Sequence, residues 1–255
     1  MINKPFNLAP ISFFKIDKLR FFLYAFFVAF ASQIIFWSQT ENIKPNYEII
    51  PIPPNQYFLS AASFGDNEFL FRTLAFRIQN SGDIFLKFTA LKDYDYLRLY
   101  QWLTLLDSLN AKSNLMPSLA SYYFSQTQKK EDSAYIVQYL SEHASKDLDA
   151  NWWWIFQAIT IAQKDLHNED WALKLAYKLS ENNAQNAPLW TKQMPAFIYA
   201  KQGNNCMAFT IIQKIIEDNN SGGRQISVEE MNFMRYFIND RLKTLKNQNF
   251  DPRKC

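Results

Sequence analysis

The sequence predicts an all-α protein, in which antiparallel helix pairs stack on one another behind a single membrane-spanning helix. Only 5 glycines occur in 255 residues, and alternating Thr/Val patterns are few, which argues against an all-β domain. From Asp66 onward, apolar residues recur at helical spacing. Near the start, the 17 residues from Phe21 to Trp37 contain no charge.

This uncharged stretch predicts a transmembrane anchor over residues 21–38. A spanning helix needs about 17–25 predominantly apolar residues. Trp37 stands where an interfacial aromatic side chain is favoured. The side chains that we expect to contact lipid are Phe21, Phe26, Phe27, Phe30, Ile34 and Trp37.

Basic residues before the anchor predict its orientation. Residues 1–20 carry four basic residues and one acidic residue, which accounts for the whole net charge of +3. The positive-inside rule therefore places residues 1–20 in the cytoplasm. The remaining domain is then expected in the periplasm or an equivalent compartment, anchored in the inner (plasma) membrane.

Two other readings of this segment stay open. Ala29-Phe30-Ala31 matches the small-x-small pattern of a cleaved signal peptide, although the apolar run continues through Trp37. The segment also has the composition of a buried helix in a soluble protein. The anchor and the signal peptide place the domain in the same compartment.

Charge and cysteine content narrow the possible partners. Beyond residue 20, basic and acidic residues balance, so electrostatic capture of nucleic acid has no support. Cys206 and Cys255 are the only cysteines, and one bridge between them is possible in an oxidising compartment. We expect instead that Cys206 is a small core residue and that Cys255 has no structural role.

The expected organisation has an extended linker over residues 39–64, a helical-repeat domain over 65–248 and a tail over 249–255. The run from Ile50 to Pro54 disfavours helix and favours a polyproline-like stretch. This stretch would either hold the domain off the bilayer or lie along a groove of the domain.

Helix signals follow one another through the domain. Asp66 and Asp93 are expected helix caps, Gly203 a helix end, and Ser227-Val-Glu-Glu230 a capping box. Residues 84–92 are ambiguous and suggest a short extended piece. The expected helices cover 68–79, a segment after Asp93, a segment from Ser113, a segment around 134–140, 152–163, 171–179, 189–202, 207–216 and a segment from Ser227, with a break at Gly222-Gly223.

The spacing of these helices predicts repeats. Helix pairs begin near Ser113, Asn151 and Ala187, at offsets of 38 and 36 residues. Units of this length, each made of two helices joined by a short turn, are typical of an α-solenoid.

Over about residues 94–219 the sequence resembles a degenerate tetratricopeptide repeat. Trp154 and Ala158 fit the first-helix pattern of that family, and Trp190 fits the same place one unit later. Alanines that fit the second helix, and the proline that often closes a repeat, are Ala172, Ala176, Ala208 and Pro188. The resemblance implies a concave groove, lined by first helices, that holds an extended peptide or a partner helix.

Aromatic clusters are the candidate partner-binding residues. Consecutive residues of a helix point about 100° apart, so Trp152-Trp153-Trp154 sweeps roughly 200° of the surface. One packed interface does not cover all three, so the alternatives are packing on several sides or a side chain that faces a partner. The candidates are Tyr122, Tyr123, Trp152, Trp153 and Trp190.

The sequence contains no recognisable catalytic motif. Asp93 and Asp95 sit at a helix start, where capping explains two acids. His143 and His167 are the only histidines and lack metal-ligand spacing, and His143 suits the negative end of its helix. No phosphate loop or nucleophile elbow occurs. We expect no enzyme activity, no cofactor and no metal.

The function predicted from these features is that of a membrane-anchored docking or scaffold protein, which binds a partner protein or peptide in an envelope complex. The alternative is a structural accessory subunit of a multi-subunit membrane assembly of the respiratory or transport type. In that case the anchor itself would pack against other membrane helices.

Overall fold

The computed structural model describes residues 13–40, 48–84, 87–181, 186–220, 226–241 and 255. The chain divides into two compact units, Met1–Glu48 and Ile49–Cys255. Helices provide nearly all of the described secondary structure in both units, as predicted. The expected break at Gly222-Gly223 and most of the tail, residues 249–254, lie outside the described residues.

The first unit contains one helix, α1 (Phe13–Thr40). Its part from Leu19 to Thr40 has 22 residues and a mean hydropathy of 1.8, and none of it is buried. The six predicted anchor side chains, Phe21, Phe26, Phe27, Phe30, Ile34 and Trp37, are all exposed. The hydroxyls of Ser32 and Thr40 donate to carbonyls one turn earlier, so they are satisfied within the helix. Length and composition therefore allow this helix to cross a membrane.

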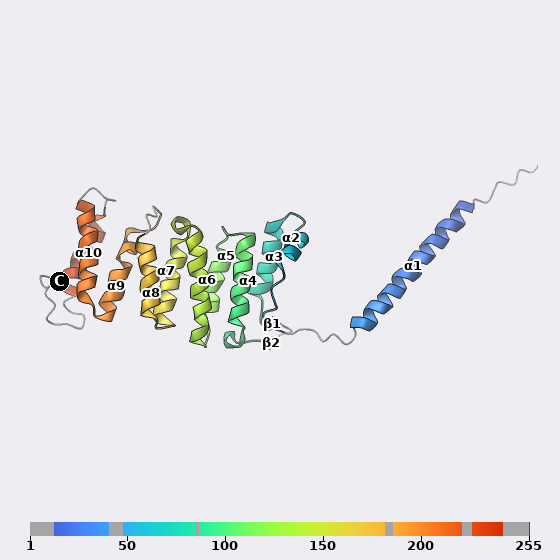
Figure 1. Cartoon of the computed structure of the whole chain (residues 1–255), viewed down its shortest axis with the longest axis horizontal. Coiled ribbons are helices and arrows are strands. Elements are labelled where there is room, and N and C mark those ends of the chain that lie inside the picture. Colours follow the sequence, from blue (N-terminus) through green and yellow to red (C-terminus); the bar gives the residue numbers. More distant parts are fainter. Residues whose placement is uncertain (1–12, 41–47, 85–86, 182–185, 221–225, 242–254) are drawn as a thin grey trace, which may run out of the picture. The chain divides into compact units, whose positions relative to one another are not determined.

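The second unit consists of helices joined by short turns (Figure 1). The α-helices are α2 (Gln56–Ala62), α3 (Asn67–Gln79), α4 (Tyr96–Leu109), α5 (Leu115–Ser118), α6 (Ser133–Lys146), α7 (Leu148–Lys164), α8 (Glu169–Ser180), α9 (Met194–Gln202), α10 (Asn205–Asn220) and α11 (Val228–Tyr236). The helical turns are η1 (Leu91–Asp93), η2 (Leu119–Tyr123), η3 (Phe124–Gln126), η4 (Lys130–Asp132), η5 (Leu189–Gln193) and η6 (Phe237–Arg241). Strands β1 (Asp83–Ile84) and β2 (Lys87–Phe88) pair antiparallel in the ambiguous region.

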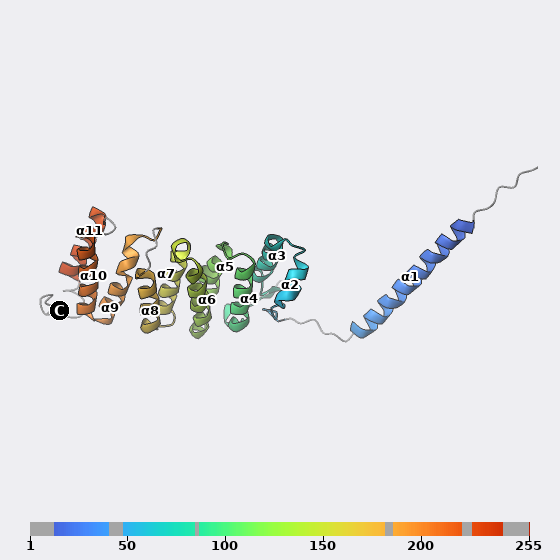
Figure 2. The same cartoon turned by 45° about the horizontal axis from the view of Figure 1, so that its top comes forward.

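Helices α3, α4 and α6 to α10 lie side by side in chain order (Figures 1 and 2). Helices α6 and α7 begin close to the expected places. The helix expected over 189–202 is divided into the turn η5 and α9, which begins at Met194. The hydrogen bonds between different elements commonly join residues one unit apart, for example Lys130 to Asp165, 35 residues on, and Asp149 to Asn186, 37 residues on. These bonds therefore connect equivalent places in successive units.

Most predicted helix ends are confirmed. Asp66 caps α3 by accepting from the Phe69 amide at 2.9 Å, and Ser227 caps α11 by accepting from Glu230 at 3.2 Å. Gly203 ends α9 with a φ of 82°, which favours glycine. The prediction that Asp93 caps α4 is wrong, because Asp93 belongs to turn η1 and Asp95 accepts from the Arg98 amide instead.

The expected linker over residues 39–64 is wrong for the part from Ile49 onward. Ile50 is 1% exposed and packs in the core of the second unit. The indole of Trp102 on α4 donates to the Pro51 carbonyl at 2.7 Å. Residues 56–62 form α2. Of the two alternatives for the proline-containing stretch, packing against the helical domain is the one observed, because Ile50 has an apolar pocket to fill.

The apolar core runs continuously from α3 to α9, and a second cluster joins α9, α10, α11 and η6. Fully buried alanines recur where neighbouring helices meet, and a small side chain lets two helices approach closely. These include the positions of the repeat resemblance, Ala158, Ala172, Ala176 and Ala208, each 0% exposed.

A buried polar group holds α4 against α6. Asp107 is 2% exposed and accepts from the Tyr139 hydroxyl at 2.8 Å and from Lys146 at 3.0 Å. The His143 ring nitrogen Nδ1 lies 2.7 Å from the same carboxylate. His143 lies in the last turn of α6, as predicted. Its contact with the carboxylate of Asp107 on α4 is a feature that the sequence did not indicate.

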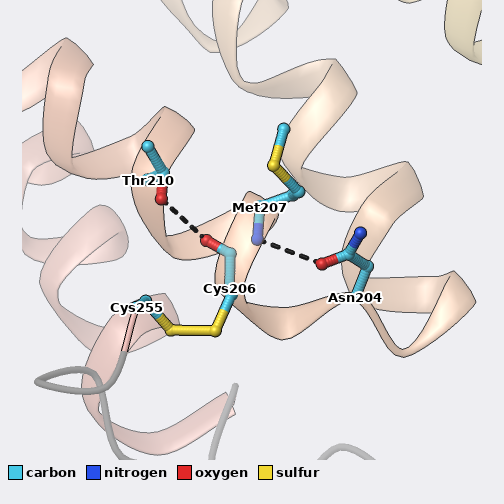
Figure 3. The surroundings of a disulfide bond; sticks show 5 residues. All are labelled: Asn204, Cys206, Met207, Thr210 and Cys255. Atoms are coloured by element: carbon cyan, nitrogen blue, oxygen red, sulfur yellow. Dashed lines mark hydrogen bonds between the residues drawn. A yellow bond between two sulfur atoms is a disulfide. The ribbon is translucent and has the colours of Figure 1, made fainter.

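Cys206 and Cys255 form a disulfide (Figure 3). The bond joins the first turn of α10 to the last residue of the sequence, 49 positions away. The expectation of two unpaired cysteines is therefore wrong. Cys206 is exposed rather than part of the core, so its thiol is available to a distant residue.

We predict that Asp107→Ala lowers the free energy of unfolding by about 3 kcal/mol, because removing one partner of a buried charged group leaves the others unpaired. Urea unfolding followed by circular dichroism measures the change. Lys130→Ala, which removes the exposed pair with Asp165, is the matched control and should cost less than about 1 kcal/mol. Equal losses in the two variants would contradict this role for Asp107.

Candidate functional site

Helix α7 presents the three consecutive tryptophans in different surroundings. Asp147 caps the helix by accepting from the Ala150 amide at 3.1 Å, and the backbone kinks at Asn151 just before the tryptophans. Trp154 is 7% exposed and its indole donates to Asn114 at 3.1 Å. Trp152 and Trp153 are only half-buried. The triplet thus divides between the core and the surface.

The two half-buried tryptophans belong to one cluster of rings, which we call the tryptophan cluster. Its members come from three segments, η2, α7 and η5, and are Tyr122, Trp152, Trp153, Phe156 and Trp190. Ring centroids lie 5.5 Å apart for Trp152 and Trp153, and 5.9 Å apart for Trp152 and Trp190. Phe156 lies 5.3 Å from Trp153 and 5.1 Å from Trp190, so the rings form a continuous chain of contacts.

A hydrogen bond ties Tyr122 to this chain of rings. The Trp153 indole donates to the Tyr122 hydroxyl at 2.7 Å. The Tyr122 ring is 55% exposed and lies edge-on to buried Trp154 at 6.3 Å. Contact with the core on one side therefore restrains the rings of the cluster, while their other side is accessible.

Four of the five predicted partner-binding residues, Tyr122, Trp152, Trp153 and Trp190, come together in the tryptophan cluster. Tyr123 does not, although it follows Tyr122 directly. Its ring is 45% exposed and packs on Phe124 at 5.0 Å, and Phe124 is fully buried. The π-helical turn η2 directs the two tyrosines to different places.

Phe156 is the member that sequence reasoning missed. It stands four residues after Trp152, so the two side chains share a face of α7. That spacing was the available signal. Its importance comes from Trp190 of the next unit, whose ring is nearer to Phe156 than to Trp152.

Tyr123 instead lines an open cleft of about 350 Å³ between the end of α3 and η2. The Tyr94 hydroxyl donates to the Ser81 carbonyl beside it. Gly82 has a φ of 87°, and a Cβ at this position would collide with the Tyr94 side chain. The other lining residues are Gln79, Asn80, Asp83, Phe88, Thr89 and Leu119.

The side chains at these two places supply aromatic rings, hydroxyls, amides and one carboxylate, that of Asp83. Within the described part of the chain, no group of three or more His, Cys, Asp or Glu side chains is placed to hold a metal ion. The tryptophan cluster offers apolar ring faces together with indole and phenol groups. Such rings desolvate much area and lose little conformational entropy on binding.

We predict that Tyr94 makes the stability of the protein fall in alkali. Burial raises the pKa of Tyr94 to about 12, whereas an unfolded tyrosine titrates near 10. The stabilisation by the neutral phenol is therefore complete below about pH 10 and is lost as the pH rises towards 12, by up to roughly 2–3 kcal/mol.

Urea unfolding of wild type and Tyr94→Phe, at about pH 9 and about pH 11.5, measures this loss. Tyr96 and Tyr139 also have raised pKa values through burial, so the variant keeps part of the decline. The difference in stability between the two proteins should shrink at the higher pH. The same difference at both pH values would contradict the prediction.

Comparison with protein-family models, with curated proteins and with solved structures finds no match to this chain. The function proposed below therefore rests on its own residues.

Proposed function

We propose that this protein is a membrane-anchored docking protein, which binds a partner protein or peptide through the tryptophan cluster. The observation that carries the proposal is the set of restrained, partly exposed rings from three segments of the chain. Helix α1 would hold the protein in the membrane, and the helices of the second unit would display the cluster.

The rings have the physical properties of a binding hot spot. Residues that dominate binding energy are enriched in tryptophan and tyrosine and are held in place before the partner arrives. Trp152, Trp153 and Trp190 are held by ring contacts, and Tyr122 is held by its hydrogen bond to Trp153. Because these rings are already restrained, their binding to a partner would cost little conformational entropy.

The arrangement that we propose for the second unit is a tetratricopeptide-like superhelix. Two observations support it: hydrogen bonds between elements recur at separations near one unit, and buried alanines occupy the resemblance's second-helix positions. Trp190 departs from the family, because it lies in the turn η5 and is half-exposed. The cluster would line the concave side of this superhelix.

The disulfide supports the proposed orientation. Stable disulfides are typical of oxidising compartments such as the bacterial periplasm or the lumen of the endoplasmic reticulum. The basic residues before α1 favour the cytoplasm for the N-terminus. Both signals therefore favour a second unit on the side of the membrane away from the cytosol, and they are independent of each other.

We predict that Tyr122→Ala abolishes partner capture and that Tyr123→Ala does not. Tyr122 belongs to the cluster and Tyr123 does not, yet the two are adjacent and similarly exposed. Loss of a hot-spot side chain costs about 2 kcal/mol or more, which is roughly a thirtyfold loss of affinity.

The measurement is photo-crosslinking of the full-length protein in its native membranes, with a benzophenone amino acid in place of Lys192, which lies in the turn η5 beside Trp190 but is not a member of the cluster. A discrete adduct is expected for the parent and for the Tyr123→Ala background, and it should be lost with Tyr122→Ala. The far-UV helical signal of all variants must be the same. An adduct of equal yield in both backgrounds would reject the cluster as the docking surface.

We also predict that the protein has no free thiol in its native membranes. Cells are quenched with acid, and the denatured protein is then treated with a maleimide-polyethylene glycol reagent. The wild type should react only after reduction, whereas Cys206→Ser should react at Cys255 without reduction. Reaction of both wild-type thiols before reduction would contradict the proposed compartment.

A further inference from the structure

The most exposed apolar side chains of the second unit are concentrated in its first residues. Among the described residues from 49 onward, large apolar side chains at least 66% exposed occur at Ile52, Tyr57, Phe58, Phe64, Phe69, Phe76, Phe88 and Val228. All of these except Val228 lie between residues 52 and 88. A soluble domain rarely gathers so much exposed aromatic surface without a partner for it.

Five of these aromatic residues, which we call the anchor-proximal patch, lie on α2, α3 and the turn between them: Tyr57, Phe58, Phe64, Phe69 and Phe76. Phe69 and Phe76 stand seven residues apart on one face of α3, and the opposite face of that helix is buried in the core. Figures 1 and 2 show α2 and α3 at one end of the row of helices. The end of a helical stack normally carries a polar outer face, whereas this one carries phenylalanines.

Phe64 is the most exposed member and its backbone is strained. It is 97% exposed and has a φ of 46°, a left-handed conformation that a bulky residue rarely adopts. Gly65 follows with a φ of 87°. The side chain gains nothing from packing within the chain. Strain of this kind is typically kept where the side chain has a use outside the core.

The length of the chain limits where this patch can lie. Thr40 ends α1, and Ile50 is buried in the second unit. Ten residues span at most about 35 Å, even when fully extended. If α1 crosses a bilayer, the beginning of the second unit cannot move further than this from the membrane surface. Among the large apolar side chains of the unit that are at least 66% exposed, Ile52 and then those of the patch come first along the chain after α1.

We propose that the anchor-proximal patch inserts into the interfacial region of the same bilayer that α1 spans. Tyrosine suits this region because its ring is apolar and its hydroxyl can stay hydrated. Phenylalanine rings serve as the apolar face of helices that lie in the interface, where they enter the boundary between headgroups and acyl chains. The charges on α2, α3 and the turn between them balance, because residues 56–79 carry two acidic residues, Asp66 and Glu68, and two basic residues, Arg72 and Arg77. Glu68 pairs with Arg72 at 2.7 Å. Burial of the rings, rather than attraction to anionic lipid, would therefore hold the patch. The proposal rests on the membrane anchor of the proposed function.

The test uses the full-length protein in phosphatidylcholine nanodiscs that contain a phosphatidylcholine with a diazirine in its headgroup region. After irradiation, peptides that carry lipid adducts are mapped by mass spectrometry. We expect adducts at the ends of α1 and in peptides over residues 56–76. The matched control is the peptide with the exposed side chains Val228, Phe233 and Tyr236, which should carry about tenfold fewer adducts.

The variant Phe58→Ser/Phe64→Ser/Phe69→Ser should lose the adducts over 56–76 and keep those of α1, with an unchanged far-UV helical signal. Adducts on α1 alone in the wild type would contradict the proposed insertion of the patch, while they would still agree with α1 as a membrane anchor. The absence of adducts on both would overturn the anchor and the patch together. Adducts over 56–76 that are as abundant in this variant as in the wild type would also overturn the proposal, because they would not depend on the rings of the patch.

Discussion

Each helix of the second unit buries its apolar face against the helices that precede and follow it in the chain. The core from α3 to α9 is continuous because every pair of neighbours extends it. Hydrogen bonds between elements obey the same rule, as the bond between Lys201 and Glu169, 32 residues earlier, illustrates. Stacks in which each helix packs on its neighbours in the chain leave their end faces and lateral surfaces for other contacts.

The special features of the protein lie where this packing leaves surfaces open. On a lateral surface, the rings of Trp152 and Trp190 come from successive units and meet only because those units are neighbours. At the first end, Phe69 and Phe76 lie on the face of α3 that stays exposed, opposite the buried face of that helix. Towards the other end, the disulfide from Cys206 fixes the last residue to α10. The proposed docking surface, the proposed membrane surface and the disulfide thus all lie where the packing between neighbouring helices leaves side chains exposed.

Local signals were enough to predict much of the fold. The caps at Asp66 and Ser227, the end at Gly203 and the positions of the helix pairs depend on a few adjacent residues, and they are observed. Asp93 and Asp95 both stand before the same apolar stripe, so the sequence does not distinguish them as caps of α4. The turn η1 takes up Asp93 and leaves Asp95 as the cap. Four of the five candidate binding residues lie together because large aromatic residues repeat at the period of the units.

The features that sequence reasoning missed depend on contacts between distant residues. Asp107 contacts His143 only because α4 and α6 pack in one particular register. No sequence pattern near either residue predicts that contact. The bridge from Cys206 to Cys255 spans 49 residues. The prolines that follow Ile50 disfavour a helix, so this stretch was expected to be a linker. A buried extended segment is equally compatible with those prolines. In each case the partner is supplied by the tertiary structure.

The claim on which the proposed functions depend is that the second unit lies outside the cytosol. A reporter enzyme fused after Cys255, active only once it has been exported, tests this claim in intact cells. The account predicts a fully active reporter that sediments with the membranes and is released by detergent. A reporter that is active only in its cytosolic form, or a full-length fusion recovered in the soluble fraction without detergent, would contradict it.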